Sequence, residues 1–416
     1  MNDRIRLGLI GCGGRMMGSH VPGFAKRKDC EITAVCDVAE SRREKAAKKV
    51  QELSGKRPSI FSNLRRVIES AQVDAVVIAT PDHWHCPAAM LACQAGKDVY
   101  VEKPVSHSVA EGRQLIAVAV EHNRVVQVGA QNRSGESNAS AREYLASGKL
   151  GPIELVRVYN QAVDTSIVNK PDAPKPAGLD WNQWLGPAPE RPYNPGRHYG
   201  WRWYWDYAGG DVTDDTVHQL DLACQLLEIR QLPKTVRSVG IAHPGNDEKM
   251  AGTLATQFEF EDLVLLYNQT QNTPYMVKSD QGVRNGDLFP YWPQNGTRIE
   301  IFGEAGLMVV GRHGGGWQVF QRTKSRKPVV TAEQHGRFPD DAHKEDFLDA
   351  VRTRRTPNGD LESAHRSATL CHLANISYRV GNQLLEIDRE RETIVGNDAA
   401  NALIQPNRRE GFNFGS

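Results

Sequence analysis

A chain of 416 residues is too long for one typical domain and has room for a large core, so we expect two domains. Its 51 Lys and Arg against 50 Asp and Glu give a formal charge of +1, which argues against nucleic acid or an anionic membrane as a partner. Its apolar runs, such as residues 75–79, are far shorter than the roughly 20 residues that cross a bilayer, which leaves small molecules as the expected partners.

The first third of the chain alternates short apolar runs with segments of helical pattern. The expected strands are residues 5–10, 31–36, 74–79, 98–101 and 125–128. The expected helices between them are residues 41–53, 85–95 and 109–122. This alternation is typical of βαβ units, so it predicts a doubly wound parallel Rossmann sheet over residues 1–132.

After about residue 150 the pattern changes to that of a second domain, residues 133–416. The expected strands are residues 153–159, 235–242, 253–261, 263–269 and 298–302, and the expected helices are 342–351 and 363–380. Their alternation predicts an α+β domain with an open, mainly antiparallel sheet, helices on one face, and a C-terminal segment able to pack back on the first domain. A proline-rich stretch up to Tyr199 predicts a long loop, which in compact domains is usually functional.

The seven cysteines are odd in number and scattered through mostly apolar stretches. This usage favours reduced thiols and a cytoplasmic location over a disulfide framework. No charged and then apolar leader precedes the first strand, so we expect no cleavable signal. His83, His85 and Cys86 are of metal-ligand types, but no second cluster has a matching spacing, so no metal is expected.

A glycine-rich turn lies between the first strand and the first helix. It departs from the GxGxxG pattern because the last position is Met16, but the strand before it and the helix after it favour dinucleotide binding. The candidates for cofactor contact in this turn are Gly11, Gly13, Gly14, Arg15 and Met16.

Asp37 ends the second strand, where a carboxylate accepts hydrogen bonds from ribose hydroxyls and repels a 2′-phosphate. The sequence therefore favours NAD over NADP. Arg42 and Arg43 follow at a helix start, where such residues are more often solvated than bound to phosphate.

Residues 100–106, YVEKPVS, place Glu102, Lys103 and Pro104 where a buried apolar strand ends. Glu and Lys are seldom fully buried unless paired, and a residue before proline is held extended. Because doubly wound sheets bind ligands at their carboxyl edge, these side chains are expected to face the crevice between the cofactor and the second domain.

Four landmarks in order resemble the Gfo/Idh/MocA oxidoreductases, a family named for glucose-fructose oxidoreductase and inositol dehydrogenase. They are the glycine turn, the ATPDHWH stretch of residues 79–85, the Glu102-Lys103-Pro104 tripeptide, and the GGDVTDDTVH stretch of residues 209–218. The spacing of Asp214 and His218 is similar to the DxxxH motif of the family. The resemblance implies an NAD-dependent oxidoreductase acting on sugars or polyols, and a homodimer or homotetramer formed through the open sheet.

The resemblance also implies a role for individual residues. Cofactor contacts are implied for Thr80, Pro81, His85, Glu102, Lys103, Gln131, Asn132, Trp201 and Arg202. A catalytic role is implied for Lys103, Asp214 and His218, with His218 as general base and Asp214 one helical turn before it on the same face. It further implies a cis bond between Lys103 and Pro104.

The chemistry of alcohol oxidation calls for the same residue types. A base must remove the hydroxyl proton as hydride leaves, and a cation must hold the developing alkoxide. His218 and Lys103 can supply the base and the cation. The alternatives are that His218 is a core histidine and that Lys103 forms a structural ion pair with Glu102.

Aromatic residues gather in YGWRWYWDY, residues 199–207, with Trp181 and Trp184 just upstream. Such rings either stack on the CH faces of a sugar or fill the core between the domains. The candidates for substrate contact are Lys103, Arg133, His198, Tyr199, Arg202, Asp214 and His218.

Three functions stay open at this point. The first is an NAD-dependent dehydrogenase of a sugar, inositol or sugar derivative. The second is an NAD-dependent glycoside hydrolase, which oxidises its substrate transiently; such relatives carry an apolar residue at the position of Lys103, so Lys103 favours net oxidation. The third is a non-catalytic nucleotide- or sugar-sensing protein, which the presence of Lys103, Asp214 and His218 together argues against.

Overall fold

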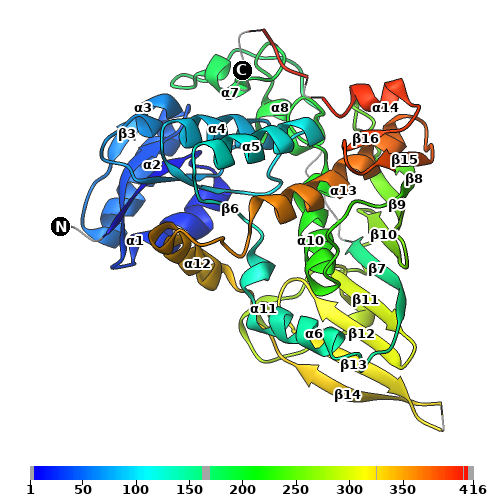
Figure 1. Cartoon of the computed structure of the whole chain (residues 1–416). Coiled ribbons are helices and arrows are strands. Elements are labelled where there is room, and N and C mark those ends of the chain that lie inside the picture. Colours follow the sequence, from blue (N-terminus) through cyan, green and yellow to red (C-terminus); the bar gives the residue numbers. More distant parts are fainter. Residues whose placement is uncertain (1–3, 162–168, 325, 406, 411–416) are drawn as a thin grey trace.

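The computed structural model describes residues 4–161, 169–324, 326–405 and 407–410, and it contains one sheet of six strands and one of ten (Figure 1). Part of the proline-rich stretch, residues 162–168, lies outside these described residues. No helix within the described ranges combines the length and the apolar character that a bilayer span requires.

The first sheet is parallel throughout and has helices on both faces. Its strands, in their order across the sheet, are β3 (Ser59–Phe61), β2 (Cys30–Cys36), β1 (Ile5–Ile10), β4 (Ala75–Ile78), β5 (Asp98–Val101) and β6 (Val126–Val128). Its helices are α1 (Val21–Ala25), α2 (Glu40–Ser54), α3 (Leu64–Ile68), α4 (His85–Gln94) and α5 (Val109–Glu121). The predicted doubly wound fold is confirmed.

Burial explains why most strands of this sheet were predictable. Every residue of β4 and β5 is buried, as expected for strands covered on both faces. The strand order reverses between β1 and β4, and the carboxyl edge at such a switch point is where open α/β sheets bind ligands. The edge strand β3 was not predicted, because it has only three residues and its first, Ser59, is exposed.

The second sheet is mainly antiparallel, as predicted. In their order across the sheet its strands are β14 (Pro328–Gln334), β13 (Trp317–Arg322), β12 (Gly306–Gly311), β11 (Arg298–Gly303), β7 (Ile153–Gln161), β10 (Val264–Thr270), β9 (Ala251–Glu259), β8 (Thr235–Ala242), β15 (Leu385–Asp388) and β16 (Thr393–Ile394). Only the β7 and β10 pair is parallel. The strands β12 to β16 were missing from the predictions.

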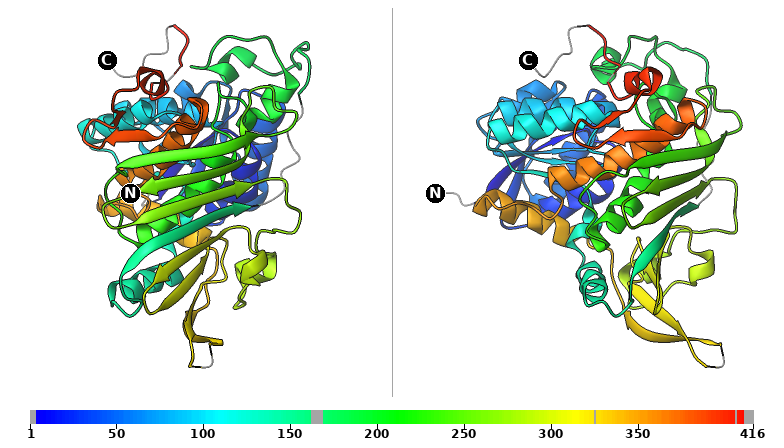
Figure 2. Two further views of the ribbon diagram at one scale, coloured as in Figure 1. Left: turned by 90° about the vertical axis from the view of Figure 1, so that its right-hand side faces the viewer. Right: turned by 45° about the vertical axis from the view of Figure 1, so that its right-hand side comes forward.

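One face of this sheet is covered by helices and the other is open, which Figure 2 shows in its left view. The covering helices are α6 (Glu136–Ala146), α10 (Thr216–Leu226) and α13 (Leu361–Arg379). Alternate residues of β9, including Leu254 and Phe258, are buried against them, whereas Ala255 and Gln257 between are exposed.

The C-terminal part of the chain returns to the first domain. In α12 (Asp340–Thr353), Phe347 and Leu348 are fully buried in the same cluster as Leu7 of β1. Ala364 and Ala368 of α13 join the core on the other face of the first sheet. The last helix, α14 (Asp398–Ala402), packs beside β16.

The described part of the proline-rich stretch forms short helices and an aromatic core. These elements are α7 (Trp181–Leu185), α8 (Pro195–Tyr199) and the 3₁₀ helix η4 (Trp201–Trp203). Trp181 and Trp184 stack with ring centroids 4.5 Å apart, and Tyr207 meets Trp184 edge on at 4.9 Å. The expected loop is thus a packed layer over the carboxyl edge of the first sheet.

Candidate active site

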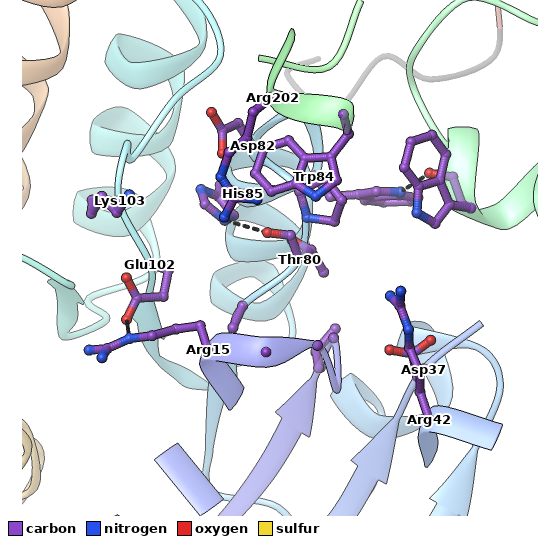
Figure 3. Close-up of a pocket in the computed structure, with 18 of the residues that line it drawn as sticks. Arg15, Asp37, Arg42, Thr80, Asp82, Trp84, His85, Glu102, Lys103 and Arg202 are labelled. Atoms are coloured by element: carbon purple, nitrogen blue, oxygen red, sulfur yellow. Dashed lines mark hydrogen bonds and ion pairs between the residues drawn. The ribbon is translucent and has the colours of Figure 1, made fainter. Parts of the chain in front are cut away.

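A cavity of about 750 Å³ lies between the carboxyl edge of the first sheet and the second domain (Figure 3). It brings together most of the predicted site residues, namely Gly11, Gly13, Gly14, Arg15, Asp37, Thr80, Pro81, His85, Glu102, Lys103, Gln131, His198, Tyr199, Trp201, Arg202, Asp214 and His218. Three predicted residues do not line it: Met16, Asn132 and Arg133.

The glycine turn fits the backbone approach of a dinucleotide phosphate. Gly11 has a φ of +83°, and a Cβ there would lie 2.8 Å from the Ala79 oxygen, so only glycine suits this position. The positions of Gly13 and Gly14 leave nothing within 4 Å of an added Cβ, so this side of the turn is open to the cavity. The chain continues as a helix from residue 14, which turns backbone N–H groups toward this opening.

Met16 does not contact the cavity, contrary to the prediction. It begins the π-helical segment η1 (Met16–His20), and its side chain is fully buried in the core with Leu7 and Leu9. The motif position that Met16 occupies lies on the helix face that packs against the sheet. Its side chain therefore anchors the turn.

Asp37 stands at the end of β2, where ribose hydroxyls were expected. Its Oδ2 accepts from the Cys12 backbone N–H at 2.7 Å and its Oδ1 from that of Ala39 at 2.8 Å. Burial raises the pKa of Asp37, and these N–H donors act against that shift. Arg42, expected in solvent, lines the same cavity, whereas Arg43 reaches the Asp37 carbonyl.

Thr80, Pro81 and His85, which were predicted as cofactor neighbours, follow β4 and line the cavity. His85 also contacts the Glu102-Lys103-Pro104 tripeptide. The Thr80 hydroxyl is buried and has no hydrogen-bond partner among the described residues. The ring of His85 lies between two carbonyl oxygens, 2.7 Å from that of Pro104 and 2.9 Å from that of Thr80. Burial lowers the pKa of His85, so the neutral ring donates to one of them. The predicted cis bond between Lys103 and Pro104 is confirmed.

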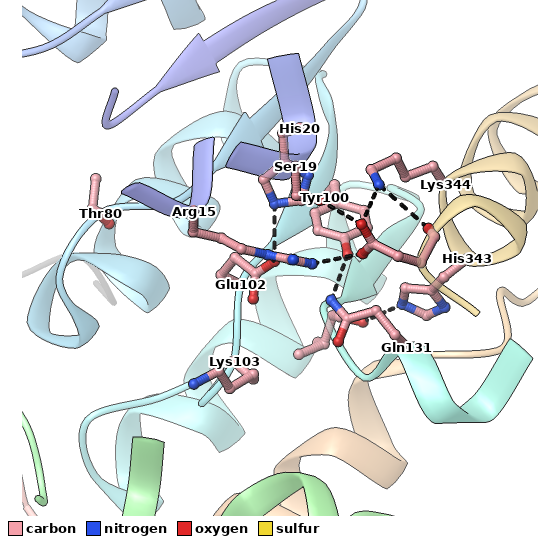
Figure 4. A network of polar contacts seen from close by, with 12 residues as sticks. Arg15, Ser19, His20, Thr80, Tyr100, Glu102, Lys103, Gln131, His343 and Lys344 are labelled. Atoms are coloured by element: carbon pink, nitrogen blue, oxygen red, sulfur yellow. Dashed lines mark hydrogen bonds and ion pairs between the residues drawn. The ribbon is translucent and has the colours of Figure 1, made fainter. Parts of the chain in front are cut away.

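Glu102 is the centre of a buried polar network (Figure 4). Its Oε1 accepts from Arg15 Nε at 2.7 Å and lies 2.9 Å from His20 Nε2. Burial alone would raise the pKa of Glu102, but the Arg15 charge and the His20 hydrogen bond outweigh it and hold the pKa well below its usual range. Arg15 also pairs with Asp340 of α12 at 2.8 Å. Glu102 is therefore an ionised carboxylate that fixes Arg15 at the cavity wall.

Lys103 pairs with Asp214, so the alternative of an ion pair with Glu102 is wrong. Its ammonium donates to Asp214 Oδ1 at 2.8 Å and to the main-chain oxygen of the same residue. Arg202 Nε lies 2.9 Å from the other carboxylate oxygen. Burial would raise the pKa of Asp214, but the Lys103 and Arg202 charges hold it below its usual range. One carboxylate thus orients two cations in the cavity.

His218 reaches the cavity from a different helix than expected. Asp214 ends the short helix α9 (Asp211–Asp214), and His218 belongs to α10, so the two do not share the face of one continuous helix. No described residue hydrogen-bonds to the ring of His218, which lines the cavity although it is 6% exposed. Burial, followed by the Arg312 and Lys103 charges, lowers the pKa of His218 well below its usual value. The ring is a neutral imidazole with its nitrogens available to a ligand.

Gln131, Asn132 and Arg133 follow the end of β6 in the 3₁₀ helix η3 (Gln131–Ser134), and their side chains lie in different surroundings. Gln131 lines the cavity and donates to the Tyr100 hydroxyl at 3.3 Å. The next two residues turn away: Asn132 is buried, and Arg133 makes a bidentate pair of 2.8–2.9 Å with Asp221 of α10. Arg133 therefore holds two elements together and is not a substrate contact.

The aromatic stretch divides between the two expected roles. Trp201 lines the cavity under the guanidinium of Arg202, which lies 4.2 Å from its ring centroid. Trp203 is buried in the core, and Trp205 donates to the Glu248 carbonyl.

The two other substrate candidates of this stretch lie at the cavity in different settings. His198 is buried beside Trp184, and burial and the Arg42 charge lower its pKa to about 4. Tyr199 is 64% exposed at the cavity rim.

Several cavity residues were missed by the sequence reasoning. They are Arg65, Asp82, Trp84, Asn182, Gln183, Asp215, Arg284, Arg312, His313, Phe338 and Arg409. Asp82 and Trp84 lie inside the ATPDHWH stretch and could have been proposed from it. The arginines after residue 280 follow weakly patterned segments, so no signal in the sequence pointed to them.

His83, which was weighed as a metal ligand, is buried and its Nε2 lies 3.0 Å from the Trp184 carbonyl. Burial lowers its pKa to about 3. His83 therefore packs in the aromatic core beside Trp184 and Tyr207.

Comparisons with known proteins agree with this fold. Residues 5–130 match the model of the oxidoreductase family with an NAD-binding Rossmann fold, and residues 165–275 and 294–414 match its C-terminal alpha/beta domain. An inositol 2-dehydrogenase of Rubrobacter xylanophilus is 34% identical over 165 residues, which are 39% of this chain and 46% of that protein. A glycosyl hydrolase family 109 protein of a Shewanella species is 37% identical over 121 residues, 28% of this chain and 26% of that one. The chain thus spans less than half the length of the curated relatives it matches.

Solved structures share the whole architecture at low sequence identity. Levoglucosan dehydrogenase in complex with NADH and levoglucosan superposes with a TM-score of 0.68 at 18% identity, over 93% of this chain and all of that one. The WlbA dehydrogenase of Bordetella pertussis, in complex with NADH and UDP-GlcNAcA, gives 0.66 at 21% identity, over 92% and 99% of the two chains. At these identities the likeness establishes the fold. With both family models matched in order over most of its length, the chain belongs to the Gfo/Idh/MocA family of oxidoreductases.

Proposed function

We propose that this protein is an NAD-dependent oxidoreductase that transfers hydride at a secondary hydroxyl of a sugar, inositol or sugar derivative. The observation that carries the proposal is that a neutral His218 and the ammonium of Lys103 line the same cavity as the open glycine turn. When bound, the nicotinamide supplies the hydride acceptor or donor. His218 accepts the hydroxyl proton, and Lys103 donates to the reacting oxygen and stabilises its negative charge.

Asp214 positions two cations, Lys103 and Arg202, in this proposal. Its carboxylate holds Lys103 at 2.8 Å and Arg202 at 2.9 Å, so neither cation has to be ordered when the substrate enters. Trp201 lines the cavity next to Arg202 and offers apolar ring surface to the CH face of a sugar. The direct test measures NADH formation at 340 nm with a panel of sugars and inositols. The absence of turnover with every member of the panel would contradict the proposal.

NAD is the proposed cofactor because Asp37 ends β2 at the cavity. Asp37→Ser should raise the Kd for NAD by about tenfold, since a ribose hydroxyl loses a charged acceptor. The preference of the protein for NAD over NADP should decrease as a result. Arg42 lines the same region and would favour a 2′-phosphate, so the ratio of the two Kd values for the unaltered protein decides between the cofactors. Tighter binding of NADP would exclude the assignment to NAD.

Glycoside hydrolysis through transient oxidation is the second candidate. Support comes from the family 109 relative, whose matched segment covers only 28% of this chain. Lys103 argues for net oxidation, because such relatives carry an apolar residue there. Release of an aglycone from a nitrophenyl glycoside without net NADH would favour this candidate. The third candidate, a non-catalytic sensor, is favoured if saturable sugar binding is found and no turnover occurs.

The open face of the ten-stranded sheet supports a homodimer or homotetramer. Sedimentation at micromolar concentration tests this assembly, for which a monomer is the contrary outcome. All seven cysteines are buried free thiols, which supports a reducing, cytoplasmic setting.

A further inference from the structure

One end of the cavity carries more positive than negative charge. Two carboxyl groups in this region, Asp82 and Asp211, have pKa values that burial raises, so they carry less negative charge than exposed carboxyls. Five cationic side chains, Lys103, Arg202, Lys278, Arg284 and Arg312, are arranged around two paired carboxylates, those of Asp214 and Asp215. All of them except Lys278 line the cavity directly. The excess of positive charge lies beside His218, where the substrate is proposed to bind.

Arg312 is buried with part of its hydrogen-bonding capacity unused. Its side chain is 6% exposed, and one terminal nitrogen lies 3.0 Å from Asp215 Oδ1. Its Nε is buried and has no partner among the described residues. Asp215 is shared with Lys278 at 2.7 Å, so a single carboxylate faces two cations. A buried guanidinium that lacks a full set of acceptors is the type of group that binds a carboxylate or a phosphate.

Arg284 adds a second guanidinium with no counter-charge. Its Nε donates to the Ser279 carbonyl at 2.7 Å, and no carboxylate of a described residue pairs with its terminal nitrogens. It belongs to the short helix α11 (Gln281–Asn285), which Asp280 caps by accepting from the Val283 N–H at 3.0 Å. Asp280 thus caps the helix, and no ion pair joins its carboxylate to Arg284 in the described part of the chain.

The turn after β12 places the two arginines together. Three glycines with positive φ, Gly314 to Gly316, follow Arg312 and His313. A Cβ on Gly314 would lie 2.9 Å from the Arg284 Cα, and one on Gly315 would lie 2.7 Å from Pro290. Only glycines allow this turn to approach α11 so closely. The fold thus brings Arg284 and Arg312 to the same wall of the cavity.

Resting on the proposed function, we infer that the substrate is an anionic sugar, with a carboxylate or phosphate group that Arg284 and Arg312 bind while Lys103 and His218 act on a hydroxyl. The carboxylate or phosphate of the substrate is not altered in this step. At the reacting carbon, the hydride of the C–H bond goes to the cofactor and the hydroxyl proton goes to His218. Two arginines at one end of the cavity would fix the ring so that a single hydroxyl reaches the reacting position.

The test compares glucose, glucuronate and glucose 6-phosphate at matched ionic strength with NAD. One anionic sugar should exceed glucose in kcat/KM by about tenfold or more, the size of one charged hydrogen bond, and which of the two does so distinguishes carboxylate from phosphate. Arg284→Gln should lower the anionic to neutral ratio by about tenfold. Arg322→Gln removes the same charge from an exposed residue of β13 and should leave the ratio unchanged.

Binding gives a readout that does not require turnover. With NADH present, tryptophan fluorescence should report glucuronate or glucose 6-phosphate binding about tenfold tighter than glucose, and Arg284→Gln should remove most of this difference. Oxidation of glucose with equal or better efficiency, or a ratio unaffected by Arg284→Gln, overturns the inference and leaves the proposed function standing. Tight anion-dependent binding without oxidation of any sugar would instead reject the proposed function.

Discussion

Arg15 of the glycine turn and Asp340 of α12 form an ion pair of 2.8 Å, although 325 positions separate them in the chain. The same carboxylate accepts from Lys344 at 2.6 Å, and the Lys344 side chain is only 2% exposed. A helix of the C-terminal segment therefore fixes a residue at the cofactor end of the cavity. Arg15 in turn holds Glu102, so the network extends to the residue next to Lys103.

Asp340→Asn should lower the free energy of unfolding by roughly 3 kcal/mol, because it removes the carboxylate that hydrogen-bonds to the buried Lys344 ammonium and leaves only the exposed Asp341 near it. The Arg15, Lys344 and Ser19 interactions hold the pKa of Asp340 below its usual value, although burial acts in the opposite direction. The folded pKa is thus lower than the unfolded one, so the stabilisation is present above about pH 4 and is lost as the pH falls through the folded pKa. Urea titrations at pH 7 and at about pH 3, below the unfolded pKa, should show that the difference in unfolding free energy from the unaltered protein is smaller at the lower pH.

The matched control for this prediction is Asp341→Asn, since the Asp341 side chain is 90% exposed and lies 3.6 Å from the same ammonium. Its effect should stay within about 0.5 kcal/mol. Equal effects of the two substitutions would show that Asp340 is no more important than a surface carboxylate.

Lys103→Met should lower kcat by about 100-fold to 1000-fold, the loss expected when a donor to a developing oxyanion is removed. Asp214 keeps Arg202 as a partner in this variant, so the fold should survive. The measurements are steady-state NADH formation and the Kd for NAD. A kcat within threefold of that of the unaltered protein would remove Lys103 from the reacting oxygen.

The acid limb of kcat/KM should lie well below the usual pKa of histidine, about 6.5. Burial and the neighbouring Arg312 and Lys103 charges lower the pKa of His218, so the proton-accepting form persists below the usual range of histidine. His218→Asn should lower kcat/KM by at least 100-fold at neutral pH and remove this limb, so the difference from the unaltered enzyme should shrink at acid pH. An inflection near pH 6.5 in the unaltered enzyme would contradict the assignment.

Asp82→Asn should stabilise the protein at pH 8. Burial, and then the charge of Asp214, raises the pKa of Asp82 well above its usual value, and its Oδ2 is buried without a partner among the described residues. The raised folded pKa means that stability falls as the pH rises above the unfolded pKa, and the amide does not ionise. Tm should therefore rise by about 1–2 °C at pH 8 and by less at pH 4. A lower Tm at pH 8 would indicate that Asp82 is a stabilising carboxylate.

The sequence predicts the parts of this protein that follow from local patterns. The first sheet has continuous apolar strands such as Val99 to Val101, and the glycine turn and Asp37 occupy fixed places relative to them. The partner of Lys103 was not predictable, because both Glu102 and Asp214 are carboxylates near it in the motifs and only packing decides between them. For the same reason the sequence did not show that the break at Asp215 puts Asp214 and His218 on separate helices, or that η3 turns Arg133 toward Asp221.

The return of α12 and α13 to the first sheet has a consequence for how the chain folds. Gly359 accepts a hydrogen bond from Val128 of β6, and Phe347 fills the core beneath β1 and β5 together with Tyr100. A fragment ending at residue 132 would expose this apolar surface and lack Asp340, one of the two carboxylates that pair with Arg15. The two domains should therefore melt in a single cooperative transition, and the cofactor end of the cavity should form only after the C-terminal helices have been synthesised.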